Sequence, residues 1–558
     1  MEFDSEFDFI VSGAGSAGCA VAGRLAESGR FRVLLLEAGP KDGAFWIKVP
    51  MGYPMLFTNP KVNWMFESEP EPELNGRPMY NPRGKVLGGT SSINGMLYVR
   101  GHPNDYDTWA QMGNPGWGWD DVLPFFRKAE DQTRGADAYH GTGGPLTVSD
   151  QPNPSPVALA IIEAAVQAGV PRNADFNGAQ QEGTGLFQTT TRKRRRWNSA
   201  RAYLSRSRAN LRVDTNAHAT RLLLDGKRVI GVEYRQQGRI LRARARHGVV
   251  VSGGSFGSPQ LLQLSGIGPA EHLRDMGLPV LHDLPGVGAN LRDHFYASMI
   301  FRCHEPVTIN ELARSPLRQF IAGAQYVLAK RGPLAANGIF AGVFTRTNET
   351  KSRPNLQINT NIWSVASRDK KGMKVHDFPG FTMSPVHLDP VSTGEVRLRS
   401  ADPHADPVIR HNFFRDEVDR QAMVDAVRIV RRIANQPALG RYMAEEIRPG
   451  GEVNTDAEIV DWVRANGIAN LHPVGSCAML PGVMGVVDHR LRVHGVEGLR
   501  VADASIMPGL PAGNTNAPSI MIGEKCAAMI LEDMATASTA MSANKDRGTE
   551  WSGTTITT

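Results

Sequence analysis

Cysteine is scarce in this chain, occurring at 4 of 558 positions. None of the four (Cys19, Cys303, Cys477 and Cys526) forms a C-x-x-C pair, which disfavours zinc and iron–sulfur sites, so we expect no metal. A disulfide framework is implausible at this length, which agrees with a reducing compartment.

Long apolar runs are also missing. No uninterrupted stretch of about 18 apolar residues occurs, so we expect no transmembrane helix. The acidic start, MEFDSEFD, has neither the basic nor the apolar region of a signal peptide. The sequence therefore favours a cytoplasmic protein and leaves peripheral membrane association open.

Strong net charge is the third absence. A value of +6 is small for a chain of this length and does not indicate nucleic-acid binding. The densest basic run, RKRRR from Arg192 to Arg196, could contact nucleic acid or an anionic surface. A solvated loop, or a loop that faces cofactor phosphates, is the simpler interpretation, and we expect no nucleic-acid partner.

The chain does contain a dinucleotide fingerprint near its start. The apolar run Phe7–Val11 leads into GAGSAG, and a helical pattern and a second apolar run follow. Gly13 allows a tight turn, Gly15 lets a pyrophosphate approach the backbone, and Gly18 lets helix and strand pack closely. Glu37 ends the second strand and can accept from a ribose hydroxyl. Its charge would repel a 2′-phosphate, so FAD or NAD is favoured over NADP.

Later segments indicate an α/β fold with two kinds of sheet. A second glycine-rich loop, GKVLGGTSSING at 84–95, offers backbone and hydroxyl donors to an anion. Residues 155–169 and 416–436 predict helices, and the segment 211–251 predicts strands with a DGK hairpin turn. Beyond residue 300 the glycine turns thin out and alternating segments predict an antiparallel sheet.

Five motifs spread over the chain resemble those of the glucose–methanol–choline (GMC) flavoprotein oxidoreductases, including choline dehydrogenase-like and alcohol dehydrogenase-like members. They are GAGSAG at 13–18 with Glu37, GKVLGGTSSING at 84–95, GSFGSPQLLQLSGIG at 254–268, HPVGS at 472–476, and ADASIMPGLPAGNTNAPSIMIGEK at 502–525. The resemblance covers nearly the whole chain except its polar tail.

The resemblance implies a Rossmann-type FAD-binding domain and an antiparallel-sheet substrate domain. On this basis the FAD-binding domain comprises residues 1–155, 206–300 and 466–535, and the substrate domain comprises residues 156–205 and 301–465. The Thr-, Ser- and Ala-rich segment 536–558 is expected to be a disordered tail.

The resemblance also implies which residues hold FAD. These are Gly13, Gly15, Ser16, Ala17, Gly18, Glu37, Ala38, Val86, Gly89, Asn94, Gly95, Met96, Leu97, Ala219, Asp503, Thr515 and Asn516. Some family members carry a histidine that bonds covalently to the flavin. The matching position here is Ile93, so FAD is expected to be non-covalent.

Two further positions match the family's catalytic pair, His472 and Asn514. A neutral imidazole can accept the hydroxyl proton of an alcohol while flavin N5 accepts the hydride. The amide of Asn514 can donate to the developing alkoxide. The expected activity is oxidation of an alcohol, a primary one, to the aldehyde, with a dehydrogenase favoured over an oxidase.

Several alternatives stay open at this point. A flavin-containing lyase of the hydroxynitrile type shares the fold and the pair, whereas a family photodecarboxylase lacks the base, so His472 argues against it. A non-catalytic FAD protein and an NAD dehydrogenase are disfavoured by the intact later motifs. The sequence leaves open the alcohol, the electron acceptor (oxygen or a quinone) and the oligomeric state.

Overall fold

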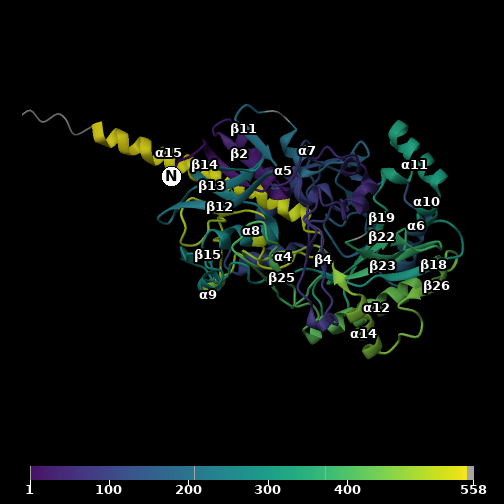
Figure 1. Cartoon of the computed structure of the whole chain (residues 1–558). Coiled ribbons are helices and arrows are strands. Elements are labelled where there is room, and N and C mark those ends of the chain that lie inside the picture. The colour runs from purple at the N-terminus through teal and green to yellow at the C-terminus, as the bar shows by residue number, and fades with distance from the viewer. Residues whose placement is uncertain (1, 206–207, 371, 550–558) are drawn as a thin grey trace, which may run out of the picture.

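The computed structural model describes residues 2–205, 208–370 and 372–549. Two large sheets organise this part of the chain (Figure 1). Within the described residues, no helix is both long and apolar enough to cross a bilayer. The four cysteines are buried and free.

The first sheet is built on the predicted βαβ unit. Its strands follow the order β11-β2-β1-β14-β13-β12, and β28 pairs with β14. Pairing is parallel from β11 through β14, which places the carboxyl ends of β1, β2 and β14 at one edge. The strands are β1 Ser5–Ser12, β2 Val33–Glu37, β11 Leu211–Thr215, β12 Ala217–Asp225, β13 Arg228–Gln236, β14 Arg239–Val251 and β28 Leu499–Val501.

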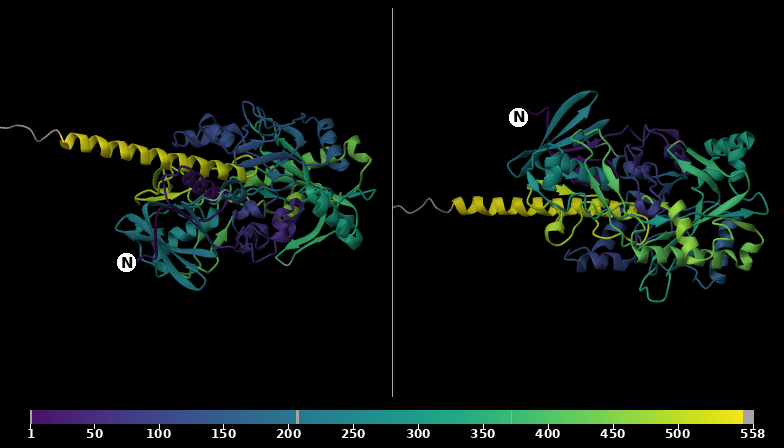
Figure 2. Two further views of the ribbon diagram at one scale, coloured as in Figure 1. Left: turned by 90° about the horizontal axis from the view of Figure 1, so that it is seen from above. Right: turned by 60° about the horizontal axis from the view of Figure 1, so that its bottom comes forward.

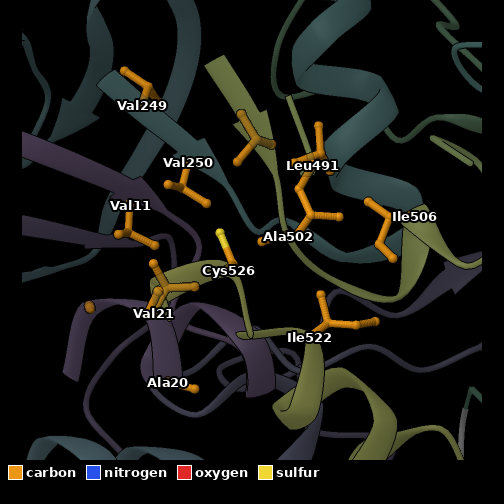
Figure 3. Packing of buried hydrophobic residues seen from close by; sticks show 14 of the residues in the cluster. Val11, Ala20, Val21, Val249, Val250, Leu491, Ala502, Ile506, Ile522 and Cys526 are labelled. Carbon is orange, nitrogen blue, oxygen red and sulfur yellow. The ribbon is translucent and has the colours of Figure 1, made fainter. Parts of the chain in front are cut away.

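Helices α1 (Ser16–Glu27) and α15 (Asn516–Thr549) pack against each other beside this sheet. Buried apolar side chains from α1, α15, β1 and β14, among them Val21, Ile522, Val11 and Val250, fill the space between them (Figure 3). Helix α8 (Gly254–Leu264) follows β14 directly. Both α1 and α8 therefore begin where a parallel strand ends.

The second sheet follows the order β26-β18-β23-β20-β19-β7 and is antiparallel as predicted. Helices α6 (Pro156–Gln167) and α12 (Glu417–Ala434) cover it, and their apolar faces share one core with β18 and β23. The strands are β7 Gly183–Leu186, β17 Phe295–Tyr296, β18 Met299–Cys303, β19 Ile339–Thr345, β20 Leu356–Asn361, β23 Gly380–His387, β26 Met443–Arg448 and β27 Ile468–Ala469.

The remaining helices are mostly short. Helix α6 begins at a capping serine, Ser155, as the sequence predicts. They are α2 Phe45–Lys48, α3 Tyr53–Leu56, α4 Pro103–Gln111, α5 Trp119–Ala129, α6 Pro156–Gln167, α7 Ser199–Leu204, α9 Ala270–Asp275, α10 Asn310–Arg314, α11 Pro316–Ala329, α12 Glu417–Ala434, α13 Pro437–Gly440 and α14 Asp456–Asn466.

The predicted disordered tail is wrong for residues 536–549, which continue helix α15 (Figure 2). The alanines of this segment favour helix, and the segment extends a helix that the core has already nucleated. Residues 550–558 lie outside the described part of the chain.

Candidate active site

Residues from both sheets line a cavity of about 680 Å³. The end of β2 contributes Glu37, the start of α1 contributes Gly15, and β20 and β23 contribute Asn359 and Ser384. All the sequence-predicted residues line this cavity except two, Gly18 and Val86. The structure thus brings together segments that lie more than 400 residues apart in the chain.

The three fingerprint glycines occupy different environments. A side chain on Gly13 (φ +105°) would lie 2.3 Å from the carbonyl oxygen of Ser252, and one on Gly18 would lie 1.9 Å from the carbonyl oxygen of Gly13. A side chain on Gly15 would meet no protein atom closer than 3.9 Å. Gly13 and Gly18 are therefore required by the packing of the protein itself, whereas Gly15 borders open space in the cavity.

Glu37 faces the start of helix α1. Its carboxylate accepts from the backbone N–H groups of Ala14 (3.1 Å) and Gly39 (2.9 Å), and burial raises its pKa to about 7. No side chain caps α1, so its first N–H groups can serve an anion. An acid beside an uncapped helix start fits a ribose next to a pyrophosphate.

The second glycine-rich loop is held in place by Arg196. Its fully buried guanidinium donates to Asn94 Oδ1 (2.8 Å) and to the carbonyl oxygens of Asn94 (2.7 Å), Ser91 (3.1 Å) and Ile47 (2.9 Å). The interpretation of the whole basic run as a solvated or phosphate-facing loop is thus wrong for Arg196. Residues 192–195 are exposed, and none of the run lines the cavity.

Ile93 and Val86 support this loop from behind. Both are buried in one apolar cluster with Ile47, Leu56 and Val62. Val86 is not among the residues that line the cavity, whereas Ile93 is, and contact of the Val86 backbone with the cofactor stays a prediction. The aliphatic side chain of Ile93 has no atom that could form a covalent bond to a flavin.

The predicted catalytic pair is in contact. The Nδ2 atom of Asn514 lies 3.1 Å from Nε2 of His472, and both side chains line the cavity. The amide nitrogen is a donor, so in this arrangement Nε2 of His472 accepts from it. Gln357 Nε2 lies 3.4 Å from the amide oxygen of Asn514 and helps to orient it.

On its Nδ1 side, the His472 ring contacts residues that the sequence analysis did not identify. Its Nδ1 lies 3.0 Å from Nδ1 of His294 and 3.0 Å from the amide nitrogen (Nδ2) of Asn470, and its backbone N–H donates to Asp293 (2.7 Å). His294 is fully buried, its Nε2 makes no well-formed hydrogen bond among the described residues, and the backbone of Leu388 lies close enough to act on its pKa. A buried polar group left unpaired is costly, which favours a functional reason for this histidine.

Burial controls protonation here. It lowers the pKa of His472 to about 3, with a further contribution from the positive charge of Arg83. Burial lowers the pKa of His294 well below its usual value, and the neighbouring His472 adds to this effect. Both imidazoles are therefore neutral near pH 7, which is the state that a base needs.

The C-terminal motif closes the cavity from another side. Asp503 accepts from the backbone N–H groups of Gly254 (2.8 Å) and Ser505 (2.8 Å) and from Ser258. Asn516, the first residue of α15, accepts from the hydroxyl of Ser16 (2.7 Å). This bond joins the start of α1 to the start of α15, and Thr515 lines the cavity beside it.

Comparisons with known proteins agree with this geometry. The GMC oxidoreductase family models match residues 7–296 and 390–523. An oxygen-dependent choline dehydrogenase from Paraburkholderia xenovorans is 44% identical over 532 residues, 94% of each chain, and one from Escherichia coli is 43% identical over 534 residues, 94% of this chain and 95% of the relative.

Solved structures are similar throughout. Pyridoxine 4-oxidase from Mesorbium loti has a TM-score of 0.84 at 30% identity and covers 93% of this chain and 98% of its own. A formate oxidase variant from Aspergillus oryzae has a TM-score of 0.88 at 27% identity, covering 96% and 99%. The chain belongs to the GMC oxidoreductase family, FAD-binding enzymes that act on CH–OH donors.

Proposed function

We propose that this enzyme oxidises a primary alcohol to the aldehyde with non-covalent FAD, His472 being the base. The observation that carries the proposal is the contact of His472 Nε2 with Asn514 Nδ2 in the cavity that also holds Gly15 and Glu37. One continuous cavity thereby contains both an acid–base pair and a dinucleotide fingerprint.

The residues of the cavity fit FAD at both ends. Glu37 and the start of α1 would hold the adenosine ribose and the pyrophosphate, and Ala219 on β12 would lie at the adenine. The loop that Arg196 fixes would hold the flavin. When bound, FAD supplies the acceptor for the hydride.

The chain itself supplies the proton transfer. A substrate hydroxyl that enters between the two side chains can donate to Nε2 of His472 and accept from Nδ2 of Asn514. The neutral imidazole takes the proton, and the amide donates to the oxygen as negative charge develops on it. Because burial lowers its pKa, His472 is neutral at pH 7 and its lone pair is free.

The charges around the cavity narrow the class of alcohol. Within the described residues that line it, the only carboxylates are Glu37 and Asp503, and both already accept backbone N–H groups. Three arginines, Arg77, Arg83 and Arg448, also line the cavity. On charge alone, this pattern favours a neutral or anionic alcohol over a quaternary ammonium such as choline, the compound in the relatives' names. Aromatic rings that also line the cavity, among them Tyr53 and Trp363, are the groups that would have to bind such a cation.

Anaerobic mixing with an alcohol panel tests both parts of the proposal. The panel contains choline, neutral aliphatic and aromatic primary alcohols, and hydroxy acids, and the loss of the yellow flavin absorbance is followed. We expect neutral or anionic alcohols to bleach the flavin fastest. Turnover without any bleaching would reject oxidation, and fastest bleaching by choline would reject the substrate class. Oxygen is then admitted to find out whether it reoxidises the enzyme.

A further inference from the structure

Helix α11 (Pro316–Ala329) presents its large apolar side chains outward. Ala322 and Tyr326 form its buried side, with exposed fractions of 3% and 2%. On the opposite side a stripe at helical spacing consists of Leu317, Phe320, Ile321, Val327 and Leu328, which are 45–85% exposed. A helix that only covered a core would bury these residues and expose the small ones. We call this set the outer stripe.

Basic residues surround the outer stripe. Every charged residue from 312 to 335 is basic, namely Arg314, Arg318, Lys330 and Arg331. None of these four forms an ion pair with a carboxylate in the part of the chain that the structure describes. The helix therefore combines an exposed apolar face with a basic flank, the pattern of helices that lie in the plane of a membrane surface.

The densest basic run of the sequence lies against this helix. Strands β9 (Thr191–Arg192) and β10 (Arg195–Arg196) form a tight hairpin whose tip is Lys193-Arg194. Both tip residues have positive φ, +49° and +58°. Turns of this kind favour Asn-Gly, so two basic residues at this tip are held there against their conformational preference.

One tyrosine ties the hairpin to the helix. Tyr326 donates its hydroxyl toward the carbonyl oxygens of Arg194 and Lys48, each 3.2 Å away, and Arg194 reaches the carbonyl oxygen of Lys330 (3.4 Å). Lys48 ends α2, whose Phe45 and Trp46 are also exposed (51% and 38%). Figure 1 shows α11 at the periphery of the molecule, remote from the first sheet.

We propose that the outer stripe and the 192–195 hairpin tip form a docking face for an anionic lipid bilayer. The apolar side chains enter the boundary between headgroups and acyl chains, and the basic residues contact lipid phosphates. A second copy of the chain fits this face poorly, because a symmetric dimer through it would bring the same basic residues of both copies together. The enzyme would then be a peripheral protein that binds by one helix.

Sedimentation of the FAD-loaded full chain with vesicles tests this proposal. We expect binding to vesicles of phosphatidylcholine mixed with phosphatidylglycerol, weaker binding to phosphatidylcholine alone, and release by salt. The triple variant Leu317→Ser, Phe320→Ser, Leu328→Ser should bind both kinds of vesicle at least about tenfold more weakly. The double variant Lys193→Asn, Arg194→Gly suits the turn and removes two charges. It should bind the anionic vesicles about tenfold more weakly and bind phosphatidylcholine vesicles as the unaltered enzyme does.

Matched controls lie elsewhere on the surface. Ile240, Leu281 and Val483 are 52–79% exposed, and replacing all three with serine should leave vesicle binding unchanged. All variants should retain FAD and the same rate of flavin reduction. Absence of vesicle binding by the unaltered enzyme, or equal binding by the outer-stripe variant, would overturn the proposal. It would also be overturned if the unaltered enzyme is a dimer in the absence of lipid and the outer-stripe variant is a monomer.

Discussion

The Nδ1 atoms of His294 and His472 lie 3.0 Å apart, although 178 residues separate them in the chain. Two facing ring nitrogens at this distance share one proton. Because Asn514 faces Nε2 of His472, we place that proton on Nδ1 of His472, where His294 accepts it. The amide of Asn470, whose Nδ2 lies 3.0 Å from the same Nδ1, must then turn its oxygen toward the ring. His294 is then a positioning residue that keeps the lone pair of His472 directed at the substrate.

A pair of substitutions at His294 tests this role. His294→Leu removes the acceptor and should slow flavin reduction, by less than the loss of His472 itself. His294→Asn keeps an acceptor oxygen near the position of Nδ1 and should restore most of the rate. Both are compared by anaerobic flavin reduction at equal FAD content. Full activity of the leucine variant would show that the tautomer of His472 does not depend on His294.

Gly15 and Gly18 provide a contrast between cofactor binding and folding. Gly15→Val adds a side chain where the nearest protein atom is 3.9 Å from its Cβ, so the apoprotein should fold and lack FAD, although its thermal stability falls without the ligand. Gly18→Val places Cβ 1.9 Å from a carbonyl oxygen and should disrupt the fold itself. Flavin absorbance and circular dichroism measure the two effects. A Gly15→Val protein with full FAD content would contradict the assignment of this turn.

Denaturation of the protein should release unmodified FAD. Because the aliphatic Ile93 lines the cavity at the position of the family's linking histidine, acid or heat should release free FAD into the supernatant. Chromatography of the supernatant identifies the released compound. Flavin that stays with the precipitated protein after denaturation would reveal a covalent link.

Local patterns predicted much of the first sheet. The strand–glycine turn–helix order predicted β1, α1 and β2, the DGK turn predicted the hairpin of β12 and β13, and a serine before proline predicted the start of α6. Each of these signals lies within a few residues of the element it predicts. The second sheet was predicted only in outline. Strand β23 is buried at all eight positions, so the alternation of Phe381 and Met383 with Thr382 and Ser384 does not separate a buried face from an exposed one, and Pro385 argues against a strand.

The parts of the site that the sequence did not predict depend on tertiary packing. Arg196 resembles its four exposed neighbours, and only its place in the hairpin makes it buried. His294 follows Asp293 in a segment with no catalytic spacing, and only the folded chain brings it to His472. The sequence did predict that His472 and Asn514 act together, because both lie in recognisable motifs.

The pH dependence of flavin reduction should report the environment of His472. Its pKa is lowered to about 3, below the ordinary value near 6.5, so protonation should stop catalysis only in strong acid. Arg83→Met removes a positive charge that contributes to this lowering. The pKa of His472 should therefore rise, and the acid limb of the rate should move to higher pH. Arg83→Lys keeps the charge and is the control. An acid limb that stays in place in Arg83→Met would show that the charge of Arg83 does not act on His472.

Substitutions of His472 and Asn514, singly and together, distinguish a catalytic role from a structural one. His472→Ala should retain FAD and fold, because its side chain hydrogen-bonds to His294, Asn470 and Asn514 and to none of the residues proposed to hold the pyrophosphate or adenine. The rate of flavin reduction should fall by about 10²–10⁴-fold, the range for a positioned acid–base group. Raising the pH should partly restore it, because more of the alcohol ionises in solution.

Asn514→Ala should also slow reduction, through loss of one donor to the developing alkoxide, with a cost of at most about 3 kcal/mol. The free-energy losses of the two substitutions should not add in the double variant, since both groups act on the same oxygen. The four rates are measured anaerobically with one alcohol at equal flavin content. Fully additive losses would mean that the two groups act independently. Wild-type bleaching by His472→Ala would place the base elsewhere in the cavity.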